Sequence, residues 1–151
     1  MMLEQTGEQT ERFQLIARWF EQLVPDSLTK IESIYAKHAR FVDPFNDLQG
    51  IESVRQVYEH MFKTLDEPRF LVTRIASTGP LGFMTWTFSF SCRGRAQSIE
   101  GCTQFELDDE GLITLHLDYW DAAKQVYEQI PLLGSVLKML RRKLSLPATV
   151  K

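Results

Sequence analysis

Apolar residues recur at helical spacing in three segments of the first 65 positions, which predicts three amphipathic helices. The first begins at Thr10 and is expected to end before Pro25. The second follows a cap at Asp26 or Ser27, and the third covers residues 51–65 after a turn-rich loop. The stripes are Phe13, Ile16, Ala17, Phe20 and Leu23; Leu28, Ile31, Ile34 and Tyr35; and Ile51, Val54, Val57, Tyr58, Met61, Phe62 and Leu65.

After Pro68 the pattern changes to the alternation that is typical of half-buried strands. The last two breaks in it are short and turn-like, so those strands are expected to pair as antiparallel hairpins. The predicted strands are residues 69–77, 82–92, 96–107 and 112–121. Helices followed by a meander of strands predict an α+β fold, in which a cone-like curved antiparallel sheet wraps around the N-terminal helices and encloses a hydrophobic pocket.

The last predicted strand reads ITLHLDYWD from Ile113 to Asp121. Its apolar residues Ile113, Leu115 and Leu117 stand at every second position, which places them on one face. The opposite face then carries His116, Asp118 and Trp120. If that face borders a cavity, these residues form a reactive wall.

A C-terminal segment, residues 126–151, combines an apolar stripe with basic residues and is interrupted near Pro131 and Gly134. We expect it to form a helical tail that packs on the domain or on a partner, where it would also act as a lid. The alternative is contact with a membrane surface, for which such a composition is suited. The domain itself is expected over residues 10–125, after a flexible N-terminus at residues 1–9.

Composition limits the class of protein further. The chain has 151 residues, 44% of them hydrophobic, and a net charge of −3, which suits one soluble domain with no general attraction for nucleic acid. Its two cysteines, Cys92 and Cys102, form no metal-binding spacing and are expected to be reduced and half-buried. The polar first residues and the absence of a long apolar run favour a cytoplasmic protein.

Two motifs carry a resemblance to a known family: YAKHARFVDPF, at residues 35–45, and DDEGLITLHLDYWD, at residues 108–121. With the order of the predicted elements they resemble the nuclear-transport-factor-2-like superfamily, and within it the SnoaL-like group. This group is related to polyketide cyclases, ketosteroid isomerase and limonene-epoxide hydrolase. The resemblance covers roughly residues 10–125 and implies a fold that hosts many chemistries.

The resemblance to ketosteroid isomerase places Asp43 where that family has its general base. The isomerase also needs an oxyanion hole of a Tyr and a protonated Asp. Trp19 and Thr103 stand at those places in this sequence, so steroid isomerisation is not expected.

The resemblance to limonene-epoxide hydrolase places Asp118 where that enzyme has a water-activating carboxylate. An Arg and an Asp of the hydrolase are replaced here by Met84 and Trp86. Epoxide hydrolysis by that route is therefore not expected. SnoaL-like cyclases pair an Asp with a neighbouring His, and this sequence retains such a pair in its second motif.

Asp118, His116 and Asp43 are the candidate catalytic residues. Desolvation makes a carboxylate in an apolar pocket a usable proton shuttle near neutral pH. His116 lies two residues from Asp118, roughly 6–7 Å along the strand, so side chains or one water would have to bridge them. Each residue also has a purely structural interpretation: Asp43 as a turn cap, His116 as a satisfied polar residue, and Asp118 as an acceptor for a tryptophan indole.

The wall of the pocket is expected to be mostly aromatic. The candidate binding residues are Trp19, Phe45, Tyr58, Met84, Trp86, Phe88, Thr103 and Trp120. The inward register that the resemblance implies makes Phe90, Ile99, Phe105 and Leu107 face the pocket as well. On the convex face, Leu115, Leu117 and Tyr119 favour a homodimer interface.

We therefore expect a protein that binds a small apolar molecule bearing a carbonyl or hydroxyl group. Isomerase, cyclase or lyase chemistry by acid/base catalysis would need no cofactor and no metal. The alternative is a non-catalytic ligand-binding or protein-interaction module built on the same fold.

Overall fold

The computed structural model describes residues 7–125 and 133–145. The chain divides into two compact units, Met1–Trp120 and Asp121–Lys151, and each is described by itself. Expectations for residues 1–6, 126–132 and 146–151 lie outside the described residues. The first unit contains all the described strands and both clusters of buried apolar side chains.

The three predicted helical segments are present, with one change of type. The elements are α1 (Gly7–Glu21), the 3-10 helix η1 (Pro25–Ser33) and α2 (Ile51–Thr64). Residues 7–9, expected to be flexible, already belong to α1. The second segment is a 3-10 helix with non-helical backbone at Lys30, and neither Asp26 nor Ser27 is its cap. The Ser27 hydroxyl instead accepts a hydrogen bond from the backbone N–H of Val24, the residue at the cap position.

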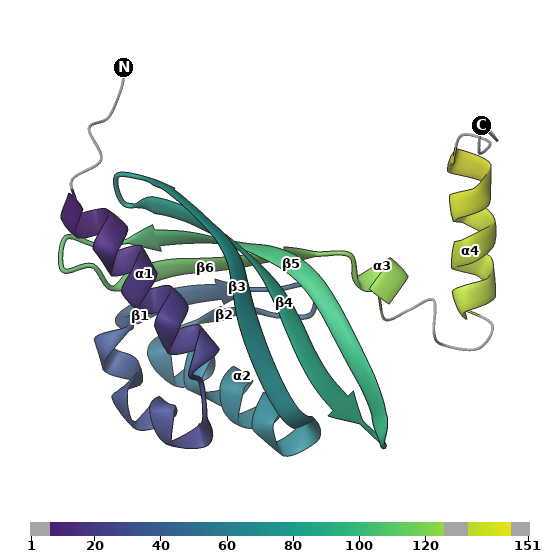
Figure 1. Cartoon of the computed structure of the whole chain (residues 1–151), viewed down its shortest axis with the longest axis horizontal. Helices are drawn as coiled ribbons and strands as arrows, with labels where there is room; N and C mark the ends of the chain where they lie inside the picture. Colours follow the sequence, from purple (N-terminus) through teal and green to yellow (C-terminus); the bar gives the residue numbers. More distant parts are fainter. Residues whose placement is uncertain (1–6, 126–132, 146–151) are drawn as a thin grey trace. The chain divides into compact units, whose positions relative to one another are not determined.

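Six strands form one sheet in the order β2-β1-β6-β5-β4-β3 (Figure 1). Their bounds are β1 (Tyr35–Val42), β2 (Asp47–Gln49), β3 (Asp66–Thr78), β4 (Leu81–Cys92), β5 (Arg95–Leu107) and β6 (Ile113–Trp120). The prediction of a purely antiparallel sheet was wrong in one pairing, because β1 runs parallel to β6. Pro68 lies inside β3 instead of before it, at the edge of the sheet, where a missing N–H is tolerated.

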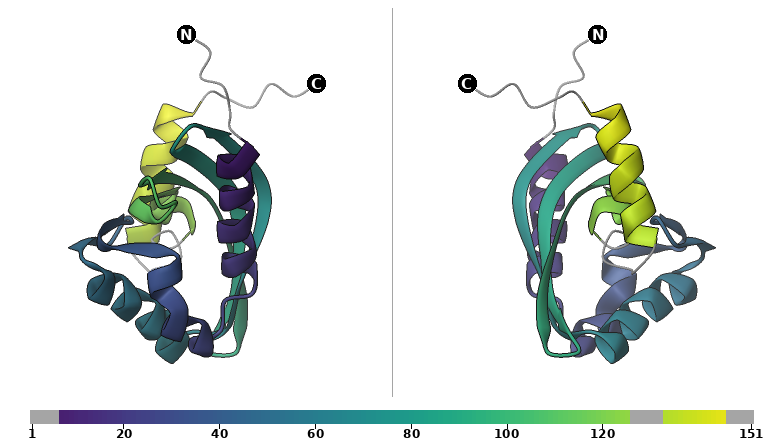
Figure 2. Two further views of the ribbon diagram at one scale, coloured as in Figure 1. Left: turned by 90° about the vertical axis from the view of Figure 1, so that its left-hand side faces the viewer. Right: turned by 90° about the vertical axis from the view of Figure 1, so that its right-hand side faces the viewer.

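The sheet curves around the helices of the first unit (Figure 2). The apolar stripes of α1, η1 and α2 pack against its inner face, and Phe13, Ile16, Ile31 and Val54 are fully buried there. The inner face also carries Met84, Trp86 and Phe88 of β4, each at most 9% exposed. The predicted inward register of β4 is therefore confirmed.

A bulge in β6 corrects the expected alternation of that strand. Leu115 is paired with Glu106 and Ile113 with Leu107, so Thr114 is an extra residue on β6. Ile113 is fully buried and faces inward, whereas it was predicted to share the outer face with Leu115. The bulge sets the phase of the strand, so that His116 faces the core at 3% exposure.

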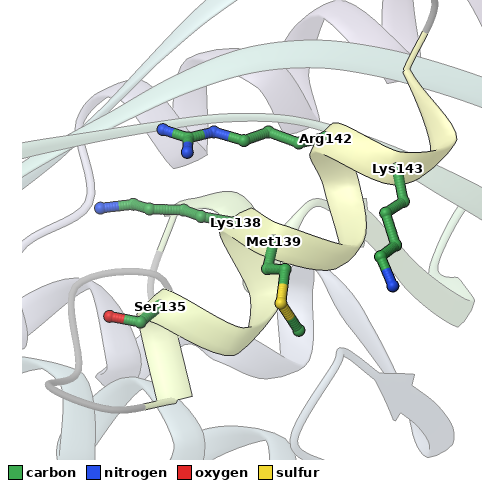
Figure 3. A pocket seen from close by; sticks show the side chains of 5 residues that line it. All are labelled: Ser135, Lys138, Met139, Arg142 and Lys143. Atoms are coloured by element: carbon green, nitrogen blue, oxygen red, sulfur yellow. The ribbon is translucent and has the colours of Figure 1, made fainter.

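The second unit contains α3 (Ala122–Gln125) and α4 (Leu133–Leu144). A shallow hollow on α4 is lined by Ser135, Lys138, Met139, Arg142 and Lys143, shown as sticks in Figure 3. All five side chains come from a single helix, so the described residues supply the hollow with no opposing wall. In the described part of the chain, no helix is long and apolar enough to cross a membrane.

Candidate functional site

One chain of buried hydrogen bonds crosses the inner face of the sheet. Tyr58 Oη lies 2.6 Å from Tyr35 Oη, and Tyr35 Oη lies 2.7 Å from Nδ1 of His116. Nε2 of His116 is 2.9 Å from Oδ1 of Asp118. From the other side, Trp86 Nε1 donates to the Thr103 hydroxyl at 2.7 Å, and that hydroxyl donates to the same Oδ1. Five residues therefore connect to the carboxylate of Asp118, and with Asp118 they come from five elements.

Strand pairing explains why these side chains meet. Met84, Thr103 and Asp118 lie in one row across β4, β5 and β6. The adjoining row on one side places His116 between Phe105 of β5 and Phe41 of β1. Because residues paired across a sheet point to the same face, the rows bring the hydroxyl, the imidazole and the carboxylate into contact.

The direction of each hydrogen bond follows from what each group can donate. An indole N–H only donates, so the Thr103 oxygen accepts from Trp86 and gives its own proton to Asp118. A neutral His116 with its proton on Nε2 donates to Asp118 and accepts at Nδ1 from Tyr35, which accepts in turn from Tyr58. Every donor in the chain then has an acceptor.

A protonated imidazole would reverse the tyrosine bonds. Nδ1–H would donate to Tyr35, Tyr35 would donate to Tyr58, and the Tyr58 proton would have no acceptor among the described residues. Such a buried, unsatisfied donor is costly. The geometry therefore favours a neutral His116 and a carboxylate on Asp118, even though their separation also meets the distance expected of an ion pair.

The two phenols are held in their neutral form. Burial raises the pKa of Tyr35 well above its ordinary value, and the neighbouring Tyr58 and Asp118 raise it further. Burial also raises the pKa of Tyr58 well above the ordinary value, against the lowering effect of its hydrogen bond to Tyr35, and the charges of Asp118 and Asp43 raise it further. Both hydroxyls thus remain donors, as the chain of hydrogen bonds requires.

Asp118 is the member of the chain that reaches solvent. Its side chain is 15% exposed, against 4% for His116. Oδ1 takes both donors, whereas Oδ2 makes no hydrogen bond within the part of the chain that the structure describes. None of the described buried side-chain oxygens or nitrogens lacks a partner, so Oδ2 is open to solvent. A bound molecule could therefore reach this oxygen directly.

Aromatic side chains surround the carboxylate. Trp86, Gly101 and Trp120 lie in the row next to Asp118, and the missing side chain of Gly101 leaves room for the Trp86 ring. Phe45 is 55% exposed and meets Trp120 edge to face, with ring centroids 5.5 Å apart. Trp19 packs edge to face on Tyr35 and Tyr58. Met84 and Phe88, also predicted to line the wall, are buried on the same face of β4.

The carboxylate of Asp43 caps the turn after β1. Its Oδ1 accepts from the backbone N–H groups of Phe45 and Asn46 and from the Asn46 side chain, at 2.7–3.0 Å. These bonds match the turn-capping interpretation, and Asp43 does not join the chain of hydrogen bonds to Asp118. Its charge also contributes to the raised pKa of Tyr58.

Sequence reasoning missed Tyr35 as a member of the site and treated it as the end of a helical stripe. Its position within the first motif was the available signal, but only the parallel pairing of β1 with β6 brings it to His116. The cysteines behave as expected: Cys92 and Cys102 are free and half-buried. Among the described residues, no three His, Cys, Asp or Glu side chains gather as metal ligands would.

Comparison with known proteins gives the family. The model of the SnoaL-like domain matches residues 16–116, and the chain belongs to this family. No match was found among proteins of curated function.

Solved structures share the fold. An LEH-like epoxide hydrolase of M. tuberculosis is 19% identical with a TM-score of 0.69, over 94% of this chain and all of that chain. An NTF2-like protein of unknown function from Burkholderia pseudomallei is 14% identical with a TM-score of 0.69, over 80% and 96% of the two chains. TsrD from Streptomyces laurentii is 19% identical with a TM-score of 0.64, over 87% and 99%. At these identities the likeness concerns the fold alone.

Proposed function

We propose that this SnoaL-like protein binds a small, mostly apolar molecule inside the cone and that Asp118 exchanges a proton with it. The observation that carries the proposal is the asymmetry of the carboxylate: Oδ1 is fixed by Thr103 and His116, and Oδ2 is open. A base held rigidly through one oxygen presents the other in a constant position, which is what general base catalysis needs.

A single positioned carboxylate supports proton transfer as the reaction class. Oδ2 takes a proton from a carbon next to a carbonyl, or from a hydroxyl, and returns it elsewhere on the same molecule. Isomerisation, cyclisation and elimination all consist of such steps and need no cofactor. His116 acts as a positioning residue, since its Nε2–H fixes Asp118 and its Nδ1 is occupied by Tyr35.

Two named relatives of the family are poor guides to the substrate. Met84 and Trp86 stand where the epoxide hydrolase pattern has charged residues, and both are buried. Thr103 stands at one of the oxyanion positions of the isomerase pattern, but its hydroxyl donates to Asp118 and is not available to an oxyanion. The proposal therefore stays with proton transfer on a carbonyl or hydroxyl compound. The rival is a binding module that uses the same pocket without chemistry.

Exchange of carbon-bound protons tests the proposal. Compact ketones, with and without an amino group, are incubated with the protein in D₂O, and deuterium uptake next to the carbonyl is followed by NMR. We expect uptake above background, and a loss of about 10²-fold or more in Asp118→Asn, which keeps the acceptor for Thr103 and His116 but removes the base. Asp109→Asn, in the exposed turn before β6, is the charge-matched control and should exchange as wild type.

Equal exchange by wild type and Asp118→Asn would refute the catalytic role of Asp118. Ligand binding without any exchange would instead support the binding module.

We also propose that the protein is a homodimer formed through the outer face of the sheet. This face exposes Phe83 at 38% and Tyr119 at 52%, with the half-buried Leu115 and Leu117 beside them. Exposed large apolar residues on one sheet face favour association.

A cytoplasmic location is proposed on the basis of the two free thiols, Cys92 and Cys102, since unpaired cysteines are usual in a reducing compartment. Fractionation of cells that express the full chain would test it. Recovery outside the cytoplasmic fraction would contradict it.

A further inference from the structure

Among the described residues of the first unit, no lysine or arginine offsets the negative charge of Asp118. Within residues 7–120, every lysine and arginine is exposed except Arg12 and Arg55, which are half-buried. Arg12 donates to the backbone carbonyls of Gly111 and Ser33 at 2.6 Å. Arg55 pairs with Glu32 and Glu52, at 3.1 and 3.4 Å. No cationic side chain of this unit thus bonds to Asp118.

The hydrogen bonds to Asp118 do not neutralise it either. Each of the two donors at Oδ1 is an uncharged group, because the bond directions make His116 neutral. Asp43, directly after β1, brings no positive charge either, since its carboxylate accepts from the backbone of Phe45 and Asn46 and from the Asn46 side chain. The inner face therefore presents a net negative charge at Oδ2 that the described residues of this unit leave unpaired.

Aromatic rings lie beside this charge. The indole of Trp86 reaches Asp118 through one intervening hydroxyl, and Trp120 stands two residues further along β6. Phe45, in the turn after β1, packs edge to face on Trp120. The face of an aromatic ring attracts cations, tryptophan most strongly, and the attraction grows where water is excluded.

We propose that the ligand of this site carries a compact organic cation, a protonated or quaternary amine, bound between Oδ2 of Asp118 and the rings of Trp86 and Trp120. This inference rests on the proposed function and names its ligand class. A carboxylate or phosphate would meet the negative charge of Asp118, which no cationic side chain among the described residues of the first unit offsets, so we expect anionic molecules not to bind.

Matched probes test the charge preference on the full chain. Choline is compared with its uncharged carbon analogue 3,3-dimethylbutan-1-ol, and cyclohexylamine with cyclohexanol and cyclohexanecarboxylate. Binding is measured by calorimetry and by tryptophan fluorescence, since Trp19, Trp86 and Trp120 all belong to the candidate site. We expect the cation of each pair to bind about tenfold or more tightly than the alcohol, and the carboxylate not to bind.

Two variants test whether the preference for cations comes from the carboxylate of Asp118. Asp118→Asn should lower the preference for the cation in each pair to the smaller part that the aromatic rings contribute, while the alcohol binds as to wild type. Asp109→Asn removes one charge from an exposed turn and should keep the full preference.

Equal binding of cations and alcohols to wild type, tighter binding of the carboxylate, or no binding of either cation would each overturn the inference. The proposed function is judged separately by deuterium exchange, so a site that exchanges ketone protons without preferring cations would refute the ligand class alone. A preference for cations that is undiminished in Asp118→Asn would also overturn the inference.

Discussion

The hydroxyl of Thr103 links the indole of Trp86 to the carboxylate of Asp118. Thr103 is 2% exposed, accepts from Trp86 and donates to Asp118. By accepting from one residue and donating to the other, the Thr103 hydroxyl fixes the Trp86 ring and the Asp118 carboxylate relative to each other. Its place in a run of alternating residues carries no such information, because the row of Met84, Thr103 and Asp118 exists only once three strands are paired.

Replacing Thr103 by valine, which has nearly the same shape, should lower the free energy of unfolding by about 1–3 kcal/mol. The Trp86 N–H would lose its acceptor in a buried place and Asp118 would lose one donor. Urea denaturation at neutral pH measures the effect. Thr85→Val is the control: Thr85 is exposed and bonds to Thr73 at the surface, so the change should be within about 0.5 kcal/mol. Similar losses in both variants would contradict the role of Thr103.

Tyr35 should make stability depend on alkaline pH. Its pKa in the folded protein is raised above the value of about 10 that it has in the unfolded chain. Below about pH 10 this contribution to stability is complete, and it is lost as the pH rises toward the folded pKa, because only the unfolded chain releases the proton. Unfolding in urea between about pH 8 and pH 11 follows the decline.

The variant Tyr35→Phe should be less stable than wild type near neutral pH, since Nδ1 of His116 loses its donor, but its stability should decline less steeply above about pH 10. Tyr119→Phe alters a half-exposed ring on the outer face and should keep the wild-type slope. A wild-type slope in Tyr35→Phe would show that Tyr35 is not the group responsible.

At the scale of the element, β5 depends on a glycine where two rings meet. A Cβ at Gly101 would lie 2.5 Å from the Trp86 ring and 3.1 Å from Cβ of Trp120. Trp86 cannot simply move aside, because its N–H is bonded to Thr103 and the residue is 9% exposed. The strand therefore needs glycine for the close approach of side chains across the sheet, and not for its backbone freedom.

Gly101→Ala should destabilise the protein by about 1–3 kcal/mol through overpacking and weaken binding of any ligand that contacts Trp86. Urea denaturation and quenching of tryptophan fluorescence are the measurements. Gly7→Ala, at the start of α1 with no atom within 4 Å of the added Cβ, should leave stability nearly unchanged. Unchanged stability in Gly101→Ala would mean that the Trp86 ring has free space beside it.

At the scale of the whole molecule, the exposed apolar residues on the outer face of the sheet predict a homodimer. Light scattering of the full chain should give the mass of a dimer. Phe83→Glu, which places a charge among the apolar residues of that face, should give the monomer. Val24→Glu also adds a charge at an exposed apolar residue, but in the turn between α1 and η1, and should remain dimeric. A monomeric wild type, or a dimeric Phe83→Glu, would contradict the proposed interface.

The elements themselves could be predicted because periodicity is local. The stripe from Ile51 to Leu65 requires a helix whatever it packs on, and the strands β3 to β6 were found to within a few residues. The expected pair Asp118 and His116 also follows from spacing along one strand. Alternation likewise placed Met84, Trp86 and Phe88 on one face of a strand, and the resemblance to the superfamily implied that this face points inward.

Only the tertiary structure decided how the site is joined. The parallel pairing of β1 with β6 brings Tyr35 to His116, and the bulge at Thr114 sets which residues of β6 face inward. Neither feature has a periodic signature, because pairing and register depend on residues some 80 positions apart, as Tyr35 and His116 are. The sequence by itself determined the elements and the candidate groups Asp118 and His116, and long-range packing determined which groups touch and which oxygen of Asp118 stays open.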